Sequence, residues 1–194
     1  AFVDGFAEGF AALARTHGVA LVGGDTTGGP LAMSVTAHGF VPPGQAITRA
    51  GAQVGDAVLV TGTLGDAVAA LHLLREGKAQ AGDSALLERM HRPTPRVAAG
   101  LALRGRAHAC QDISDGLVAD LGHICTASGV GAEIDVDALP RSAALRARFG
   151  EVAARDFALA CGDDYELVFT ASEAAVEAIC GELAGLGGAT RIGR

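Results

Sequence analysis

The spacing of apolar and polar residues predicts a series of short helices and strands. Residues 1–17 carry apolar side chains at three- and four-residue steps, the pattern of an amphipathic helix, and Gly18 is expected to end that helix. Two apolar stretches of strand length follow, at 19–22 and 31–41. The turn at 42–44, Pro-Pro-Gly, closes this first part of the chain.

A second set of elements begins at Asp56. Strands are expected at 57–61, in a short segment entering Asp112, and at 132–136, 165–171 and 189–193. Helices are expected at 66–75, from Ser84 to just before Pro93, and at 96–104, 116–128, 141–148 and 173–184. Because strands and helices alternate throughout, this part is predicted to have an α/β fold. The Gly-containing stretch 44–55 between the two parts is interpreted as a link between domains.

Composition narrows the class of protein. The 194 residues suffice for one large domain, or for one domain and part of another. A net charge of −7 argues against a nucleic-acid surface and favours small-molecule partners. No apolar run approaches the roughly 20 residues that cross a bilayer, and no secretory signal is present. The four cysteines are widely spaced, without a C-x-x-C pair, so we expect no zinc site and a cytoplasmic location.

The stretch DISDG at 112–116 places two carboxylates, Asp112 and Asp115, on either side of Ser114 at a predicted helix start. One interpretation is that Asp115 or Ser114 caps the helix. Capping does not account for both carboxylates, because two like charges this close repel each other unless a cation lies between them. Oxygen ligands of this kind suit Mg²⁺. Both interpretations stay open, and Asp120, one turn further on, is expected to be solvated.

Two further turns are candidates for ligand binding. The stretch VGGDTTGGP at 22–30 presents Asp25 between glycines that permit close approach of a phosphate, although a polar turn in which Asp25 bonds its own loop is the alternative. The stretch CGDDYEL at 161–167 presents Asp163, Asp164 and the chain's single tyrosine, Tyr165, and its alternative is a plain surface turn.

Phosphate chemistry in this chain would have to differ from that of the common nucleotide motifs. The turn 61–65 lies between a strand and a helix and could hold a phosphate, but most such turns hold nothing. The chain contains no G-x-x-x-x-G-K-[ST], no G-x-S-x-G and no H-E-x-x-H. Nucleotide binding would therefore depend on metal ions and carboxylates.

Four stretches in this order resemble the thiamine-monophosphate kinase family. They are VGGDTTGGPLAMSV with the residues that follow it to about 67, then HRPTPR, DISDGLVADLGHI and CGDDYELVF, and the likeness runs from about Leu21 to Thr170. The wider superfamily includes aminoimidazole ribonucleotide synthetase, selenophosphate synthetase and a hydrogenase maturation protein. The combination of GGDTT and GDDYEL is similar to the thiamine branch.

The resemblance implies ATP-dependent phosphorylation of thiamine monophosphate to thiamine diphosphate by direct in-line transfer, with several Mg²⁺ ions as cofactors and no certain catalytic base. The implied site residues are the metal-binding Asp25, Asp112 and Asp115, the ATP-binding Gly24, Asp25, Arg49 and Ser114, and the substrate-binding Asp163. Two positions depart from the usual family pattern. Members often carry Glu at the position of Asp163 and Arg at that of Gly28.

The resemblance also implies a domain organisation. Residues 1–43 would be the C-terminal part of an ATP-binding and dimerising N-terminal domain, 44–55 a linker, and 56–194 most of a C-terminal α/β sandwich of the aminoimidazole ribonucleotide synthetase type. A homodimer is expected. A preceding segment with further aspartates is implied, so residues 1–194 alone are expected to be inactive as a kinase. The alternatives are a superfamily enzyme with another acceptor and a non-catalytic thiamine-phosphate-binding protein.

Overall fold

The computed structural model describes residues 2–194 and divides into two compact units, Ala1–Phe40 and Val41–Arg194. In the first unit, helix α1 (Phe2–Thr16) confirms the helix predicted from the apolar spacing. Gly18 follows it with φ 65°, a left-handed conformation that suits glycine. Apolar side chains of this unit are largely exposed within the chain, Leu21 at 72% and Val22 at 91% among them.

The prediction of strands at 19–22 and 31–41 is wrong. Both stretches lack strand structure. A strand exists through hydrogen bonds to a neighbouring strand. Within the part of the chain that the structure describes, residues 20–41 take part in no backbone–backbone hydrogen bond. The apolar alternation therefore has no partner among these residues with which to form a ladder.

The second unit holds one antiparallel sheet in the order β2-β3-β1-β4. Its strands are β1 (Asp56–Thr61), β2 (Ala107–Asp112), β3 (Leu167–Ser172) and β4 (Ala189–Gly193). Its helices are α2 (Asp66–Arg75), α3 (Ser84–His91), α4 (Val97–Ala102), α5 (Leu117–Ser128), α6 (Ala143–Ala160) and α7 (Val176–Leu183). The mixed α/β fold is as predicted, and among the described residues no helix combines the length and apolar character needed to cross a membrane.

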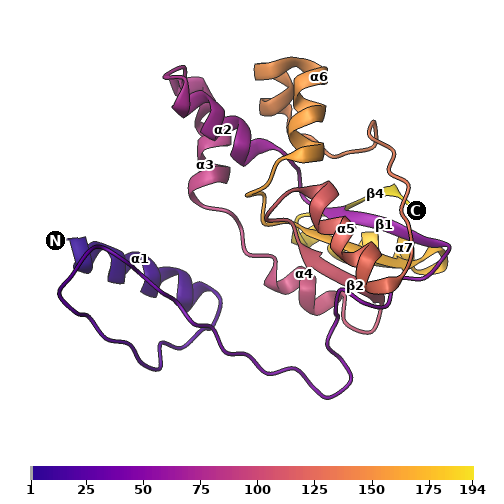
Figure 1. Ribbon diagram of the computed structural model, residues 1–194, viewed down its shortest axis with the longest axis horizontal. Helices are drawn as coiled ribbons and strands as arrows, with labels where there is room; N and C mark the ends of the chain where they lie inside the picture. Colours follow the sequence, from indigo (N-terminus) through magenta and orange to yellow (C-terminus); the bar gives the residue numbers. More distant parts are fainter. Residues whose placement is uncertain (1) are drawn as a thin grey trace. The chain divides into compact units, whose positions relative to one another are not determined.

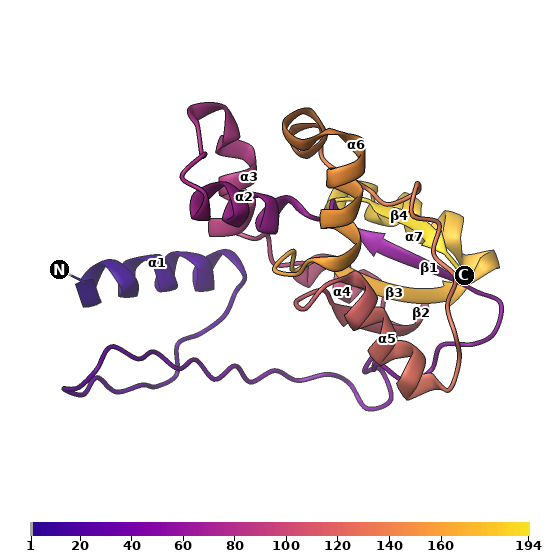
Figure 2. The same cartoon turned by 45° about the horizontal axis from the view of Figure 1, so that its top comes forward.

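Both faces of the sheet are buried, which explains why β1 is apolar along most of its length. On one face Val58 and Val60 pack with Leu121 of α5, and on the other Leu59 packs with Ile179 of α7. Figures 1 and 2 show the sheet lying between α5 on one side and α7 on the other. A third apolar cluster joins α2, α3 and α6 beyond the end of the sheet.

Two predicted elements of the second unit need correction. The strand expected at 132–136 is reduced to a single bridge between Ile134 and Gly193. Asp135 ends the pairing because its side chain accepts the amide of Asp137 at 3.0 Å, a local turn that competes with strand structure. The helix expected at 141–148 continues as α6 to Ala160, across an interruption at Gly150 with φ 78°.

The stretch 44–55 belongs to the second unit and packs against its sheet. Ile47 lies against the apolar face that holds α7, and Ala52 is buried on the face that holds α5. The carbonyl of Thr48 accepts the amide of Cys110 at 3.0 Å, so this stretch runs beside the edge strand β2. Backbone groups of an edge strand that would otherwise be unpaired are partly satisfied in this way.

Antiparallel pairing brings three turns to one end of the sheet. Strands β1 and β2 both run antiparallel to β3, with Val60 opposite Val168 and Asp112 opposite Leu167. The C-terminal ends of β1 and β2 therefore lie beside the N-terminal end of β3. Turn 61–65, loop 112–116 and turn 162–166 meet there.

Candidate functional site

Loop 112–116 presents its acidic side chains outward. Asp112 and Asp115 are exposed, whereas Ile113 between them is fully buried and anchors the loop in the core. Among the residues that the structure describes, no hydrogen bond or ion pair is found for the side chains of Asp112, Ser114 or Asp115. Two neighbouring carboxylates thus remain available to a ligand.

Helix capping does not explain these residues. The N-cap position of α5 is Gly116, and no side chain caps the helix there. The acceptor for the loop amides is instead Asp120, which was expected to be solvated and is only 1% exposed. The helical spacing indicates this burial, because Asp120 lies on the face of α5 that carries Leu117, Leu121 and Ile124.

Turn 162–166 packs directly on this loop. The amide of Asp163 donates to the carbonyl of Ser114 at 3.0 Å, and the amide of Tyr165 donates to the carbonyl of Ile113 at 2.9 Å. A Cβ on Gly162 would collide with the carbonyl oxygen of Ser114, so only glycine permits this approach. The structure therefore brings Asp112, Ser114 and Asp115 together with Asp163.

Side chains of turn 162–166 point alternately to solvent and to the interior. Asp163 and Tyr165 are exposed and have left-handed backbones, with φ 64° and 51°. Such conformations are uncommon outside glycine and cluster at functional sites. The Tyr165 hydroxyl donates to Asp163 Oδ1 at 3.2 Å. Burial, followed by the charges of Asp163 and Asp112, raises the pKa of Tyr165, so its hydroxyl stays protonated near neutral pH.

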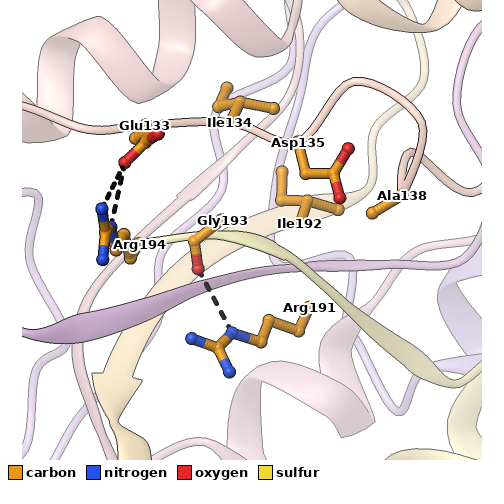
Figure 3. Close-up of a pocket in the computed structure, with 8 residues that line it drawn as sticks. All are labelled: Glu133, Ile134, Asp135, Ala138, Arg191, Ile192, Gly193 and Arg194. Atoms are coloured by element: carbon orange, nitrogen blue, oxygen red, sulfur yellow. Dashed lines mark hydrogen bonds and ion pairs between the residues drawn. The ribbon is translucent and has the colours of Figure 1, made fainter.

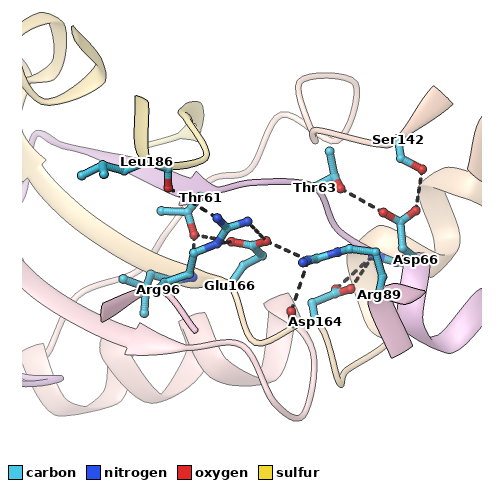
Figure 4. Close-up of polar contacts among 11 residues, drawn as sticks. Thr61, Thr63, Asp66, Arg89, Arg96, Ser142, Asp164, Glu166 and Leu186 are labelled. Atoms are coloured by element: carbon cyan, nitrogen blue, oxygen red, sulfur yellow. Dashed lines mark hydrogen bonds and ion pairs between the residues drawn. The ribbon is translucent and has the colours of Figure 1, made fainter. Parts of the chain in front are cut away.

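The inward side chain of Glu166, in the same turn, belongs to a buried ionic network with Thr61, Arg89 and Arg96 (Figure 4). Glu166 is fully buried and accepts from Arg96 through two nitrogens, each at 2.6 Å. Arg89 donates to it at 2.7 Å and the Thr61 hydroxyl at 2.6 Å. Four protein donors therefore surround a carboxylate that has no exposure to solvent, which indicates a structural role.

Turn 61–65 is unavailable to phosphate, although its position at the start of α2 suggested that it could hold one. The amide of Gly65 donates to both carboxylate oxygens of Asp164, at 2.9 and 3.0 Å, and the amide of Leu64 donates to the carbonyl of Pro140 at 2.9 Å. Burial raises the pKa of Asp164 to about 8, against the opposing effect of the Gly65 amide. Asp164 therefore ties the start of α2 to turn 162–166.

A cavity of about 550 Å³ opens beside the outward residues, with Asp112, Tyr165 and Arg104 in its lining. Arg104 is half-buried, and its side chain has no ion pair among the described residues. The cavity therefore offers a cation, a phenol and a carboxylate next to loop 112–116.

Another cavity, of about 510 Å³, lies beside β4 (Figure 3). Its lining includes Glu133, which pairs with Arg194 at 2.8 Å, and Arg191, which pairs with Glu173 at 2.7 Å. Its charged groups largely neutralise one another, and none of the predicted site residues lines it. We therefore place the candidate site at loop 112–116.

Three predicted site residues lie away from this loop in the chain. Gly24 and Asp25 belong to the first unit, where Asp25 Oδ1 accepts the amide of Thr26 at 2.7 Å, as the polar-turn alternative describes. Arg49 is exposed, and its carbonyl accepts the Ser128 hydroxyl at 3.2 Å. The structure leaves the joint metal site of Asp25, Asp112 and Asp115 as a prediction.

The donor set of loop 112–116 fits a divalent cation. Carboxylate oxygens are the ligands that Mg²⁺ takes, usually one or two of them completed by water and phosphate. Asp112 and Asp115 supply two such groups, for which residues 2–194 provide no competing donor.

The sequence and fold define the class of protein to which the chain belongs. Residues 53–194 match the family described as AIR synthase related protein, C-terminal domain. Since this match covers well over half of the chain, the chain is a member of that family.

Within this class the chain is similar to thiamine-monophosphate kinases, as its sequence motifs predicted. That of Salmonella typhimurium (strain LT2) is 46% identical over 176 residues, which are 89% of this chain and 54% of the relative. The crystal structure of the Stenotrophomonas maltophilia K279a enzyme gives a TM-score of 0.95 at 51% identity, covering 99% of this chain and 63% of that one. A solved complex of AaThiL with AMPPCP and TMP gives 0.66 at 38% identity, covering 76% and 47%. The chain spans about half the length of the curated relatives it matches.

Proposed function

We propose that this chain is part of an ATP-dependent thiamine-monophosphate kinase, which transfers the terminal phosphoryl group of ATP to thiamine monophosphate and forms thiamine diphosphate. The observation that carries the proposal is the pair of exposed carboxylates, Asp112 and Asp115, on a loop whose backbone is fixed by the core. The similarity to thiamine-monophosphate kinases supports the choice of substrates, as does the relative solved with AMPPCP and TMP.

Charge is the main physical problem of this reaction. Both substrates are polyanions, and catalysis of phosphoryl transfer consists mainly of positioning and charge neutralisation. Asp112, Asp115 and Asp25 would hold Mg²⁺, which when bound supplies positive charge beside the phosphates. Arg49 would contribute a guanidinium to ATP, and the backbone of Gly24 and the hydroxyl of Ser114 would bind its phosphates.

The acceptor needs orientation more than it needs a base. Its attacking oxygen already belongs to a phosphate, so removal of a proton by a side chain is not obligatory. Asp163 would hold the thiamine monophosphate, and its left-handed backbone and the hydrogen bond from Tyr165 fix where its carboxylate lies. Asp163 is a methylene shorter than the Glu that is common at this position, so the acceptor would lie closer to the turn.

The decisive assay supplies full-length protein and Mg²⁺ with ATP and either thiamine monophosphate or an aminoimidazole ribonucleotide precursor. We expect ADP and thiamine diphosphate with the first acceptor and no turnover with the second. Turnover with the precursor alone would reassign the chain to another reaction of the superfamily. Tight binding of thiamine monophosphate without ADP release at any Mg²⁺ concentration would make it a non-catalytic binding protein. We further propose a cytoplasmic homodimer, and light scattering of the full-length protein tests the dimer.

A further inference from the structure

Asp120 is a buried carboxylate in an otherwise apolar setting. It lies on the inner face of α5 beside Leu117, Leu121 and Ile124, and it is 1% exposed. A buried charge destabilises the fold unless donors compensate it. The donors that compensate the charge of Asp120 therefore indicate its structural role.

Four donors converge on this side chain. Oδ2 accepts the amides of Ser114, Asp115 and Gly116 at 2.9, 3.0 and 3.1 Å. Oδ1 accepts the side-chain amide of Gln111 at 2.5 Å. Hydrogen bonds to an ionised acceptor are about twice as strong as those between neutral groups. Three successive amides that point at one oxygen leave the loop backbone little freedom.

A metal-ligand role for Asp120 is less consistent with these contacts. Ligand atoms of Asp115, Asp120 and His123 lie within 4.8 Å of one another, as a metal site would require. A carboxylate offers about four lone-pair sites. Since four protein donors already use Asp120, a cation there would have to displace the bonds that hold the loop.

We propose that Asp120 is a positioning residue: its carboxylate gathers the amides of residues 114–116 and so holds Asp112 and Asp115 in their outward orientation. The kinetic part of this inference rests on the proposed function, because it concerns Mg²⁺ use by Asp112 and Asp115. The structural part concerns only the backbone of the loop. It holds whatever reaction the protein catalyses.

Hydrogen exchange of individual amides, followed by NMR in the full-length protein, tests the structural part. In the wild type, the amides of Ser114 and Asp115 should exchange at least about 10-fold more slowly than that of Gly131, an exposed loop residue with no acceptor among the described residues. In Asp120→Asn this protection should fall by about 10-fold or more. Equal exchange of Ser114, Asp115 and Gly131 in the wild type would overturn the inference, even if the variant fails to fold.

Asp83→Asn is the matched control. Asp83 is also buried, at 4%, and its carboxylate also accepts a backbone amide, that of Gln80 at 2.9 Å, while pairing with Arg148. It lies far along the chain from loop 112–116. This variant should leave exchange at 114–116 unchanged, and an equal loss of protection in both variants would indicate general destabilisation and refute the positioning role.

A reciprocal exchange supplies a rescue. In Asp120→Asn combined with Gln111→Glu, the new amide donates to the new carboxylate, so the paired bond and the net charge are both restored. We expect the double variant to recover at least half of the lost protection, measured as the logarithm of the exchange rate. Failure of the double variant to recover any protection would refute the arrangement.

Kinetics then separate this inference from the proposed function. In Asp120→Asn the Mg²⁺ concentration for half-maximal turnover should rise about 10-fold, with the KM for thiamine monophosphate changed less than 2-fold. Direct Mn²⁺ titration by electron paramagnetic resonance should show the same weakening without turnover. Lost amide protection with unchanged Mn²⁺ affinity would overturn the positioning role. A wild-type protein without kinase activity but with the expected exchange pattern would refute the proposed function alone.

Discussion

The two sides of turn 162–166 both carry carboxylates, but one side is exposed to solvent and the other is buried. Asp163 faces solvent beside Asp112 and Asp115, while Glu166 faces the interior and is bound by two arginines and a threonine. The inner carboxylate is satisfied by protein donors alone. Among the residues that the structure describes, the outer carboxylates have at most one donor, the Tyr165 hydroxyl at Asp163. A motif rich in Asp and Glu thus mixes residues that hold the fold with residues that can meet a ligand, and burial with partner count separates them.

The largest effect is expected on the inner side. Glu166→Gln leaves Arg89 and Arg96 partly buried without a compensating charge, which should lower the free energy of unfolding by about 3–5 kcal/mol. Urea denaturation measures the loss. Glu133→Gln is the control, because Glu133 pairs with Arg194 at 2.8 Å with both side chains 73% exposed. That change should cost less than about 1 kcal/mol, and equal losses would contradict the distinction between the two sides.

On the outer side the effect should fall on turnover. Asp112→Asn and Asp115→Asn in the full-length protein should each lower kcat by at least about 10²-fold, because each removes charge that holds a cation beside the phosphates. Unfolding free energies should stay within about 0.5 kcal/mol of wild type. Asp156→Asn, an exposed residue of α6, should leave kcat unchanged. Near-wild-type turnover of either outer variant at limiting Mg²⁺ would remove that residue from the proposed metal site.

The buried Asp164 should make the stability of the protein depend on pH. Its pKa is raised to about 8 in the folded protein and is near 3.9 when unfolded, so the folded state binds the extra proton. This contribution to stability is present at low pH and is lost as pH rises from about 4 through about 8. Asp164→Asn lacks the titration and still accepts from Gly65. The free energy of unfolding of this variant, taken relative to that of the wild type, should therefore be larger at pH 8 than at pH 5 by at least about 1 kcal/mol. Equal relative stabilities of the variant at pH 5 and pH 8 would contradict the raised pKa of Asp164.

The smallest effect is expected at the acceptor contact. Asp163→Ala should raise the KM for thiamine monophosphate about 5-fold while changing the KM for ATP less than 2-fold, as expected when one substrate loses a binding contact. Tyr165→Phe removes the hydroxyl that orients Asp163 and should act in the same direction more weakly. Steady-state kinetics with each substrate varied in turn decides this. Equal increases for both substrates would place Asp163 among the metal ligands.

Sequence patterns predicted most elements of the second unit because local spacing reflects which face of an element is buried. The helices α2, α3 and α5 begin and end within a residue or two of their predicted positions, and β4 lies at the predicted positions 189–193. Patterns failed where hydrogen bonding, and not the spacing of apolar residues, decides the outcome. Residues 132–136 have strand composition, but a local bond from the Asp137 amide to Asp135 leaves a single bridge.

The candidate site was predictable in its residues and not in their roles. The motifs drew attention to Asp112, Asp115 and Asp163, which the structure brings to one end of the sheet. They gave no reason to separate Asp164 from Asp163, although the first lies inside at 2% exposure. A charged residue one turn into a helix is usually exposed, which is why Asp120 was expected in solvent, although its position on the helix is on the apolar face. Its four donors come from residues 111–116, whose conformation is known only when the loop is folded.

By itself the sequence determined the order of helices and strands in the second unit, apart from the strand expected at 132–136. It also determined the resemblance to thiamine-monophosphate kinases and the set of acidic residues from which a phosphate site could be built. These follow from local spacing and from motifs. Tertiary structure alone decided which acids are structural, because a carboxylate is defined by its partners, and the partners of Glu166 lie 70 to 105 residues away in the chain. Antiparallel pairing of β1 with β3 brings Thr61 to Glu166, while Arg89 comes from α3 and Arg96 from the start of α4. The pairing of β2 with β3 leaves Asp112, Asp115 and Asp163 facing outward.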